Sequence, residues 1–284
     1  MVIHLLLLFL ICYAPTSSTA AGVEVPFYED CPKTADGTYM PNSTYQSNLA
    51  ALAAELIRNS TEYGSAAGSF GAAPDVVYGV ALCRGDSKDS LCTGYLRGAF
   101  DAAMNKTDRP LCELRKNVTL YYDRFQLRFS DRDFVSGYGN EPEWPLNNTN
   151  VVNASVAGRF REHVAALLNA TADDAETQPD RYGTGDSWFQ EERSMVYALV
   201  QCTRDMAPGR CRACLQRIIS EMPLMLDASQ IGGRVLGVRC LLRYEMASNS
   251  FFRVDNRTLH LQKQPNRTIP FTNATYYCLL KKPY

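Results

Sequence analysis

Three cysteines, Cys202, Cys211 and Cys214, form the pattern C-x8-C-x2-C, which is the densest group of reactive side chains in the chain. Thiols at such spacing either form disulfides or bind a metal ion such as zinc. A zinc site would need a second C-x2-C or an H-x3-H pair, and neither follows in the sequence. The pattern therefore favours disulfides, and we expect no metal site and no cofactor.

An earlier stretch is an incomplete copy of this pattern. Cys83 and Cys92 match Cys202 and Cys211, whereas Tyr95 stands at the position of the third cysteine. The residues that lead into each first cysteine also match, V-Y-G-V-A-L-C against V-Y-A-L-V-Q-C. Internal similarity of this kind indicates duplicated modules. The chain therefore consists of two copies of one cysteine-containing module.

Cysteines that only one copy contains predict how the thiols pair. Cys214 and Cys240 occur only in the second copy, and the first copy has Tyr95 and Phe125 at these positions. Because a lone buried thiol gains nothing, bonded cysteines tend to be lost together, and we expect the two aromatic rings to pack in place of the missing bridge. Cys278 remains unpaired and could form a covalent dimer. The expected disulfides are Cys31–Cys112, Cys83–Cys92, Cys202–Cys211 and Cys214–Cys240.

Residue combinations that could support catalysis are sparse. His163 lies beside the apolar stripe of an expected helix, and His260 lies near the C-terminus. No G-x-S-x-G, H-E-x-x-H or P-loop motif occurs. Two carboxylates from distant segments could still support glycoside hydrolysis, so a hydrolase stays an open alternative. Arg84-Gly85-Asp86 spells an adhesion tripeptide, which we interpret as a tight polar turn. The sequence predicts a binding protein rather than an enzyme.

Composition and charge narrow the class of protein. The chain has 284 residues, of which 46% are hydrophobic and 21% charged, so two globular domains are expected. A net charge of −1 argues against nucleic acid or an anionic membrane as the main partner. Residues 1–21 are predicted to be a signal peptide, because a short apolar run precedes small residues. We expect a protein secreted into the extracellular space, the apoplast, without a membrane span.

Glycosylation signals support export. The pattern N-x-S/T occurs many times, and such sites carry glycans on exposed segments of secreted proteins. The predicted sites are Asn42, Asn59, Asn105, Asn117, Asn147, Asn153, Asn169, Asn256, Asn266 and Asn273.

The elements that must position these residues follow from hydrophobic periodicity. Helices are expected within 49–57, 91–104, 160–168 and 211–222, the first of them capped by Ser43 or Thr44. Strands are expected within 75–83, 118–129, 195–202 and 234–245. Each module is therefore α+β, with two helices on a small antiparallel sheet. The expected divisions are a first module at 25–136, a linker at 137–149, a second module at 150–255 and a glycosylated tail at 256–284.

The second copy continues from its C-x8-C-x2-C motif to C-L-L-R-Y-E at 240–245, and the first copy retains C-R-G-D at 83–86 and L-R-F at 127–129. Residues 25 to 255 thereby resemble the plant cysteine-rich repeat secretory proteins, which are built from ginkbilobin-homologous modules (stress-antifungal, domain of unknown function 26). The resemblance implies a five-stranded antiparallel sheet with two helices in each module, and the same disulfide pattern.

The resemblance also implies a mannose site made of an Asn, an Arg and a Glu. In the second module these would be Asn150, Arg234 and Glu245. The corresponding residues of the first module cannot supply a charged pair; they are Pro32, Thr119 and Ser130. An Arg, a carboxylate and an amide can hold sugar hydroxyls as donors and acceptors. Two alternatives stay open. Arg234 could bridge strands to Glu245, and the modules could recognise a protein at the cell surface, since similar modules occur in receptor ectodomains and plasmodesmal proteins.

Overall fold

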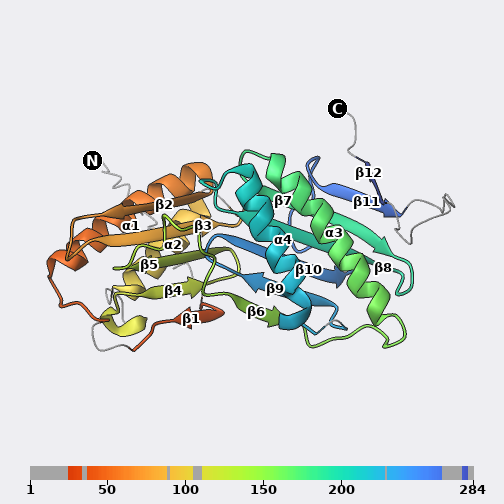
Figure 1. The fold of residues 1–284 in the computed structure, drawn as a ribbon, viewed down its shortest axis with the longest axis horizontal. Helices are drawn as coiled ribbons and strands as arrows, with labels where there is room; N and C mark the ends of the chain where they lie inside the picture. The colour runs from red at the N-terminus through yellow and green to blue at the C-terminus, as the bar shows by residue number, and fades with distance from the viewer. Residues whose placement is uncertain are drawn as a thin grey trace, which may run out of the picture.

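The computed structural model describes residues 25–33, 37–87, 90–104, 111–227, 229–263 and 277–280. The segment predicted to be a signal peptide lies outside the described residues, as do Asn105, Asn266, Asn273 and the side chain of Cys278. The described residues form two α+β modules, each with helices on one face of a sheet (Figure 1). The predicted fold class is confirmed.

The first module is a five-stranded antiparallel sheet with strand order β1-β4-β5-β3-β2. Ser43 begins its first helix, since its hydroxyl accepts the backbone N–H of Gln46 at 3.3 Å, as the sequence predicts. The strands are β1 (Tyr28–Asp30), β2 (Ser65–Phe70), β3 (Val77–Cys83), β4 (Val118–Tyr121) and β5 (Phe125–Ser130), and the helices are α1 (Thr44–Tyr63) and α2 (Ser90–Ala103), with a 3₁₀ turn at Cys112–Leu114.

The second module repeats this plan and extends it. Its sheet has the order β12-β11-β7-β8-β10-β9-β6, in which β6 to β10 correspond to the five strands of the first module. The strands are β6 (Trp144–Asn147), β7 (Tyr182–Phe189), β8 (Ser194–Cys202), β9 (Gly232–Leu236), β10 (Cys240–Ala247), β11 (Leu259–Lys263) and β12 (Tyr277–Leu280), and the helices are α3 (Ala157–Thr177) and α4 (Pro208–Met225).

The structure differs from the sequence prediction where strands are short or lie at an edge. The strands expected at 118–129 and 234–245 are each a hairpin of two strands. Strand β6 lies inside the stretch expected to be a linker. It contains Pro145, which has no N–H to donate, and such a residue is tolerated because β6 is an edge strand. Strand β11 lies in the expected tail, where Leu259 and Leu261 are buried and alternate with polar residues.

Four disulfides join cysteines of the described residues, and they are the pairs that the repeat comparison predicts. They join Cys31 to Cys112, Cys83 to Cys92, Cys202 to Cys211 and Cys214 to Cys240. In the first module the rings of Tyr95 and Phe125 stack with centroids 6.0 Å apart at the position of the missing bridge. Aromatic packing thus replaces a covalent link there.

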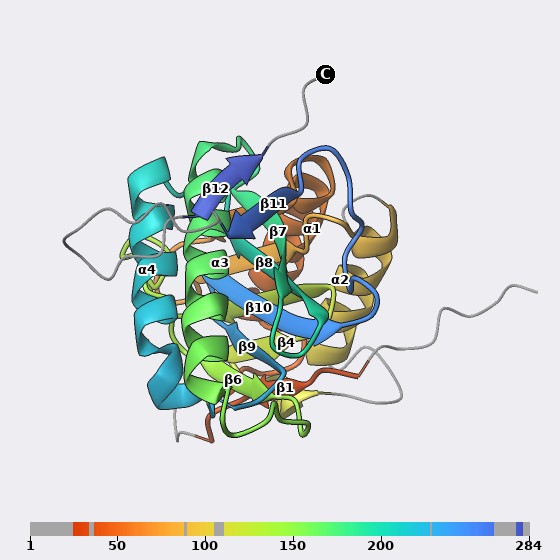
Figure 2. The ribbon, with the colours of Figure 1, turned by 90° about the vertical axis from the view of Figure 1, so that its right-hand side faces the viewer.

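The two sheets meet through the faces that their helices leave uncovered. Figure 2 shows α3 and α4 on one side of the sheets and α1 and α2 on the other. Leu82 of the first module packs with Leu199 and Leu241 of the second, and the rings of Tyr28 and Trp144 stack with centroids 3.8 Å apart. A shared cluster of apolar residues therefore joins the modules.

The R-G-D tripeptide is part of this junction. The amide of Gln201 donates to the carbonyl of Cys83 at 2.9 Å, and its oxygen accepts the backbone N–H of Gly85 at 3.1 Å. A Cβ at Gly85 would collide with the ring of Tyr182 in the second module. The tripeptide is therefore a docking turn between the modules, which agrees with its interpretation as a tight turn.

Candidate functional site

A cleft of about 240 Å³ opens where β6, β9 and β10 of the second module meet the chain that leads into β1. Leu146 and Asn147 come from β6, Gly233 and Arg234 from β9, and Arg243 and Glu245 from β10. The remaining walls are Phe27 and Asn148.

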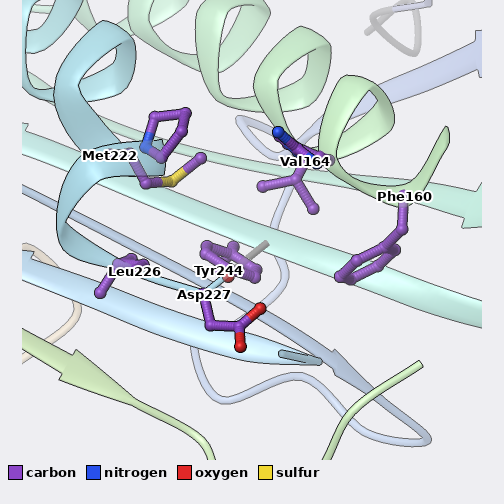
Figure 3. Close-up of a pocket in the computed structure, with 8 residues that line it drawn as sticks. Phe160, Val164, Met222, Leu226, Asp227 and Tyr244 are labelled. Atoms are coloured by element: carbon purple, nitrogen blue, oxygen red, sulfur yellow. The ribbon is translucent and has the colours of Figure 1, made fainter. Parts of the chain in front are cut away.

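Strand alternation explains why the R-Y-E motif serves this cleft. Successive side chains of a strand point to opposite faces of the sheet, so Arg243 and Glu245 lie on the uncovered face. Tyr244 points to the other face, where it packs against Phe160 and the ends of α3 and α4 (Figure 3). The pocket on that side has a volume of about 10 Å³, room for no more than a single water. The cleft on the uncovered face is therefore the candidate site.

Arg234 is held by the first module. Its Nη1 lies 2.6 Å from Oδ1 of Asp123, and its guanidinium lies 5.0 Å from the ring centroid of Phe27. Asp123 sits in the turn between β4 and β5, where Arg84 and Arg243 also reach it, at 3.1 Å and 3.4 Å. Burial alone would raise the pKa of Asp123, but the three guanidinium groups outweigh it and lower the pKa. Asp123 is therefore the ionised centre of a clasp between the modules.

The positive charge of the second arginine of the cleft, Arg243, is compensated less closely by Asp123, which lies 3.4 Å away. Burial and the neighbouring charge of Arg234 lower its pKa to about 10, although Asp123 and Glu245 act in the opposite direction. Its guanidinium packs over the ring of Phe251 at 3.9 Å. Two cations therefore share the floor of the cleft, and hydrogen-bond acceptors are favoured there.

Glu245 supplies the acceptor. Its Oε1 accepts a hydrogen bond from the Asn148 amide at 2.6 Å. The carboxylate lies directly over Gly232, so any Cβ at that position would collide with it. The carboxylate is thus positioned at the wall of the cleft, next to the amide of Asn148.

The structure brings together two of the three residues expected at a sugar site. Arg234 and Glu245 line the same cleft, but Asn150 does not. The backbone N–H of Asn150 donates to Oδ1 of Asn148 at 2.9 Å, and its carbonyl accepts the N–H of Ile231 at 3.0 Å. The amide beside the carboxylate belongs to Asn148, because the pairing of β6 with β9 sets the register and no cysteine marks it in the sequence.

Arg234 does not serve as a strand bridge to Glu245, since its ion pair is with Asp123. The corresponding residues of the first module differ in chemistry: Thr119 and Ser130 are buried. Sequence reasoning missed Phe27 and Asp123, which come from the other module. Their roles arise only where one module docks on the other, and no pattern along the sequence marks that contact.

The two histidines in the described part of the chain lie outside the cleft. His163 is buried against Phe189 with ring centroids 5.2 Å apart, and His260 Nδ1 lies 2.8 Å from Oδ1 of Asp186. Among the residues with described positions, no three His, Cys, Asp or Glu side chains are grouped to hold a metal ion. Nor does any helix in this part have the length and apolar character to cross a membrane.

Comparisons with known proteins give a consistent result. A family model described as salt stress response/antifungal matches residues 30–132 and 146–247. The chain is 34% identical over 213 residues to cysteine-rich repeat secretory protein 38 of Arabidopsis thaliana, covering 74% of this chain and 81% of that protein. It is 33% identical over 221 residues to the antimicrobial ginkbilobin-2-like protein of Castanea crenata, covering 78% and 87%.

Longer relatives and a solved structure match as well. The chain is 38% identical over 248 residues to cysteine-rich receptor-like protein kinase 6 of Oryza sativa subsp. japonica, which covers 84% of this chain but 34% of the kinase. The chain thus spans about a third of the length of this kinase. The tandem ectodomain of the cysteine-rich receptor-like protein PDLP8 of Arabidopsis thaliana superposes with a TM-score of 0.60 at 20% identity, covering 79% of this chain and 99% of that one.

Proposed function

Because the chain belongs to the salt stress response/antifungal family, with two copies of its domain, we propose that it is an extracellular, non-enzymatic protein that binds mannose-type glycans in the cleft of the second module. The observation that carries this proposal is the convergence of Arg234, Glu245 and the amide of Asn148 beside an exposed aromatic ring, Phe27. Antimicrobial and secretory relatives agree with a role outside the cell.

The chemistry of the cleft matches that of a sugar. Hexose hydroxyls both donate and accept hydrogen bonds, and here guanidinium groups donate, a carboxylate accepts and an amide does both. Phe27 is 47% exposed, so one part of its ring is free to pack against the C–H face of a pyranose. Leu146 adds an apolar wall. The polar and apolar faces of one sugar ring would both be contacted.

The expected affinity is low. About three net hydrogen bonds at roughly 0.5–1.5 kcal/mol each, with some ring packing, correspond to a dissociation constant near ~1 mM. The cleft volume also lies below the roughly 300–1,000 Å³ typical of ligand pockets, which suits a terminal sugar. Polymeric mannan, with many ends, would be retained more strongly through multivalency.

The test is an NMR titration with mannose, and retention on mannan, using protein produced without glycans. We expect saturable binding that Glu245→Gln weakens at least about fivefold, because the charged acceptor is lost while the side-chain shape is kept. Arg212→Ala, which removes an arginine of α4 outside the cleft, is the control and should bind normally. Equal binding by Glu245→Gln and the parent protein would contradict the proposal.

A second candidate function is recognition of a cell-surface protein. Trp188 of β7 is 50% exposed and lies opposite Met195 in the strand register, which offers an apolar contact away from the cleft. Absence of sugar binding, together with a loss of binding to cell surfaces in Trp188→Ala, would favour this function.

A further inference from the structure

Strand β2 forms one edge of the first sheet, and no strand of the described part of the chain pairs with its outer side. Two other edges of the molecule carry features that discourage pairing. Strand β1 has three residues, two of them acidic, and β6 contains Pro145. In contrast, β2 has six residues, S-A-A-G-S-F, with no charge and no proline. Such an edge is a template for a further strand.

The second module shows what covers the corresponding edge. Gly68 of β2 and Gly185 of β7 are equivalent, since each pairs with a residue that lies four places before the first cysteine of its module. Strand β11 lies beside β7 and pairs with it in parallel, with Leu259 opposite Gly185 (Figure 2). This strand comes from the chain that follows β10. In the first module, the chain that follows β5 leads instead into β6 of the other sheet.

The main chain of β2 is oriented to pair with such a strand. Bonded and non-bonded residue pairs alternate along antiparallel strands. The N–H of Cys83 donates to the carbonyl of Gly64 at 2.8 Å, so Gly68, an even number of residues later, also directs its main-chain groups to β3. Those of Ala67 and Ser69 therefore face outward. The equivalent bond in the second module is 2.9 Å long, so β7 presents the same outward groups to β11.

The helix-covered face of this edge has room for apolar side chains. In the second module Leu259 and Leu261 are buried at the covered edge. A Cβ on Gly185 would lie 3.5 Å from the carbonyl oxygen of Leu259, whereas one on Gly68 would meet no described atom within 4 Å. Phe70 points to the same face as Gly68 and is 43% exposed. A strand with apolar residues at two alternate positions would cover both.

We propose that the outer edge of β2 binds an extended segment of a partner protein as a parallel sixth strand, with apolar side chains at alternate positions. Main-chain hydrogen bonds and alternate side-chain contacts are how added strands are recognised. A second copy of the chain fits less well, because two identical edges related by a two-fold axis pair antiparallel. None of the residues of this edge lines the cleft of Arg234 and Glu245, so the inference does not depend on the proposed function.

The charge of the partner segment follows from the same comparison. In the second module Asp186 of β7 lies 2.8 Å from the imidazole of His260 in β11. The first module has Ser69 at the position of Asp186, since each lies opposite a tyrosine five places before the first cysteine. We therefore expect no requirement for a cationic side chain between the two apolar residues of the segment.

The probe is a synthetic peptide with the sequence of residues 257–264, R-T-L-H-L-Q-K-Q, which contains β11. Its fluorescence anisotropy is measured as the protein is added. We expect saturable binding that Ala67→Pro weakens at least about fivefold, because proline removes an outward N–H that β3 does not use. Ala67→Ser is the matched control and should bind within about twofold of the parent protein.

Two further readouts locate the peptide and test its side chains. Amide hydrogen exchange of Ala67 and Ser69 should slow several-fold when the peptide binds, whereas that of Gly68, whose N–H already pairs with β3, should not change. A peptide with Leu261→Asp should lose binding, because a charge would face the helix-covered side. A peptide with His260→Ala should bind as well as the parent peptide, since Ser69 offers it no carboxylate.

Three results would overturn the inference. They are no binding at millimolar peptide, equal binding by Ala67→Pro and Ala67→Ser, and unchanged exchange of Ala67 and Ser69. A peptide-free dimer that sedimentation detects and Ala67→Pro dissolves would place a second copy on the edge, and it would overturn the choice of occupant. Urea unfolding checks that Ala67→Pro is folded. If it is not, Ser69→Pro replaces it, because Ser69 is exposed and has the same outward N–H.

Discussion

Asp123→Asn tests whether a single carboxylate clasps the two modules. The substitution keeps the shape of the side chain but removes the charge that Arg84, Arg234 and Arg243 share. Exposed ion pairs contribute about 0.2–1 kcal/mol, whereas breaking a buried one costs about 3–5 kcal/mol. Asp123 is 30% exposed and its arginines less so. We therefore expect a loss of about 2–3 kcal/mol in the free energy of unfolding, between the two limits.

The assay is urea unfolding at pH 7, and the slope with denaturant should stay unchanged. Asp173→Asn is the matched control, because Asp173 pairs with Arg212 at the same 2.6 Å but is 62% exposed. We expect this control to cost less than about 1 kcal/mol. If the two substitutions destabilise the protein equally, the clasp does not stabilise the junction, and the reasoning from burial is wrong.

The pH dependence gives a second check on the clasp. The pKa of Asp123 is lowered in the folded protein relative to an ordinary value of about 3.9 in the unfolded chain. Its contribution to stability is therefore fully present above pH ~4 and is lost as the pH falls through the lowered folded pKa. The difference between the parent protein and Asp123→Asn should be constant from pH 7 to about 5 and should shrink below about 4. A difference that grows on acidification would contradict the assignment.

Two glycines give further tests. Gly85→Ala should destabilise the protein by about 1–3 kcal/mol in urea unfolding, because the new Cβ collides with Tyr182 across the junction. Gly232→Ala should weaken mannose binding by glycan-free protein without changing the net charge, because the new Cβ displaces the carboxylate of Glu245. Gly94→Ala on α2, where nothing lies within 4 Å, is the control for both and should leave binding unchanged and stability equal or slightly higher. Normal sugar affinity in Gly232→Ala would refute a positioning role for that carboxylate.

Much of the fold could be predicted from sequence because its signals are local or repeated. Apolar periodicity marks helices α1 to α4 of the described part of the chain, and comparison of the two copies predicts the disulfides before any geometry is known. Strand β6 escaped prediction because its Pro145 and flanking asparagines have the composition of a loop, and only its pairing with β9 makes it a strand. Short edge strands have too few buried side chains to show the alternation of apolar and polar residues that marks a strand.

The candidate site was predictable only where a residue lies at a fixed spacing from a motif. Glu245 could be found because it ends R-Y-E, and Arg234 because it lies six residues before Cys240. The sequence predicted Asn150, whereas the amide in the cleft is that of Asn148, two residues earlier. The register between strands is set by backbone pairing, which the sequence does not show. Asp123 and Phe27 had no local signal, because their roles arise when one module docks on the other.

The cleft is therefore a property of the tandem pair. In a solitary second module, Arg234 and Arg243 would lie opposite each other on neighbouring strands without Asp123 between them, and like charges at such positions repel. The first module has no charged pair at the positions that match Arg234 and Glu245, yet it supplies the carboxylate that fixes Arg234 and the ring that completes the wall. The first module thus supports the cleft of the second. Loss of a disulfide in that copy is compatible with this role, since the stacked Tyr95 and Phe125 keep its core closed while its docking turns stay in place.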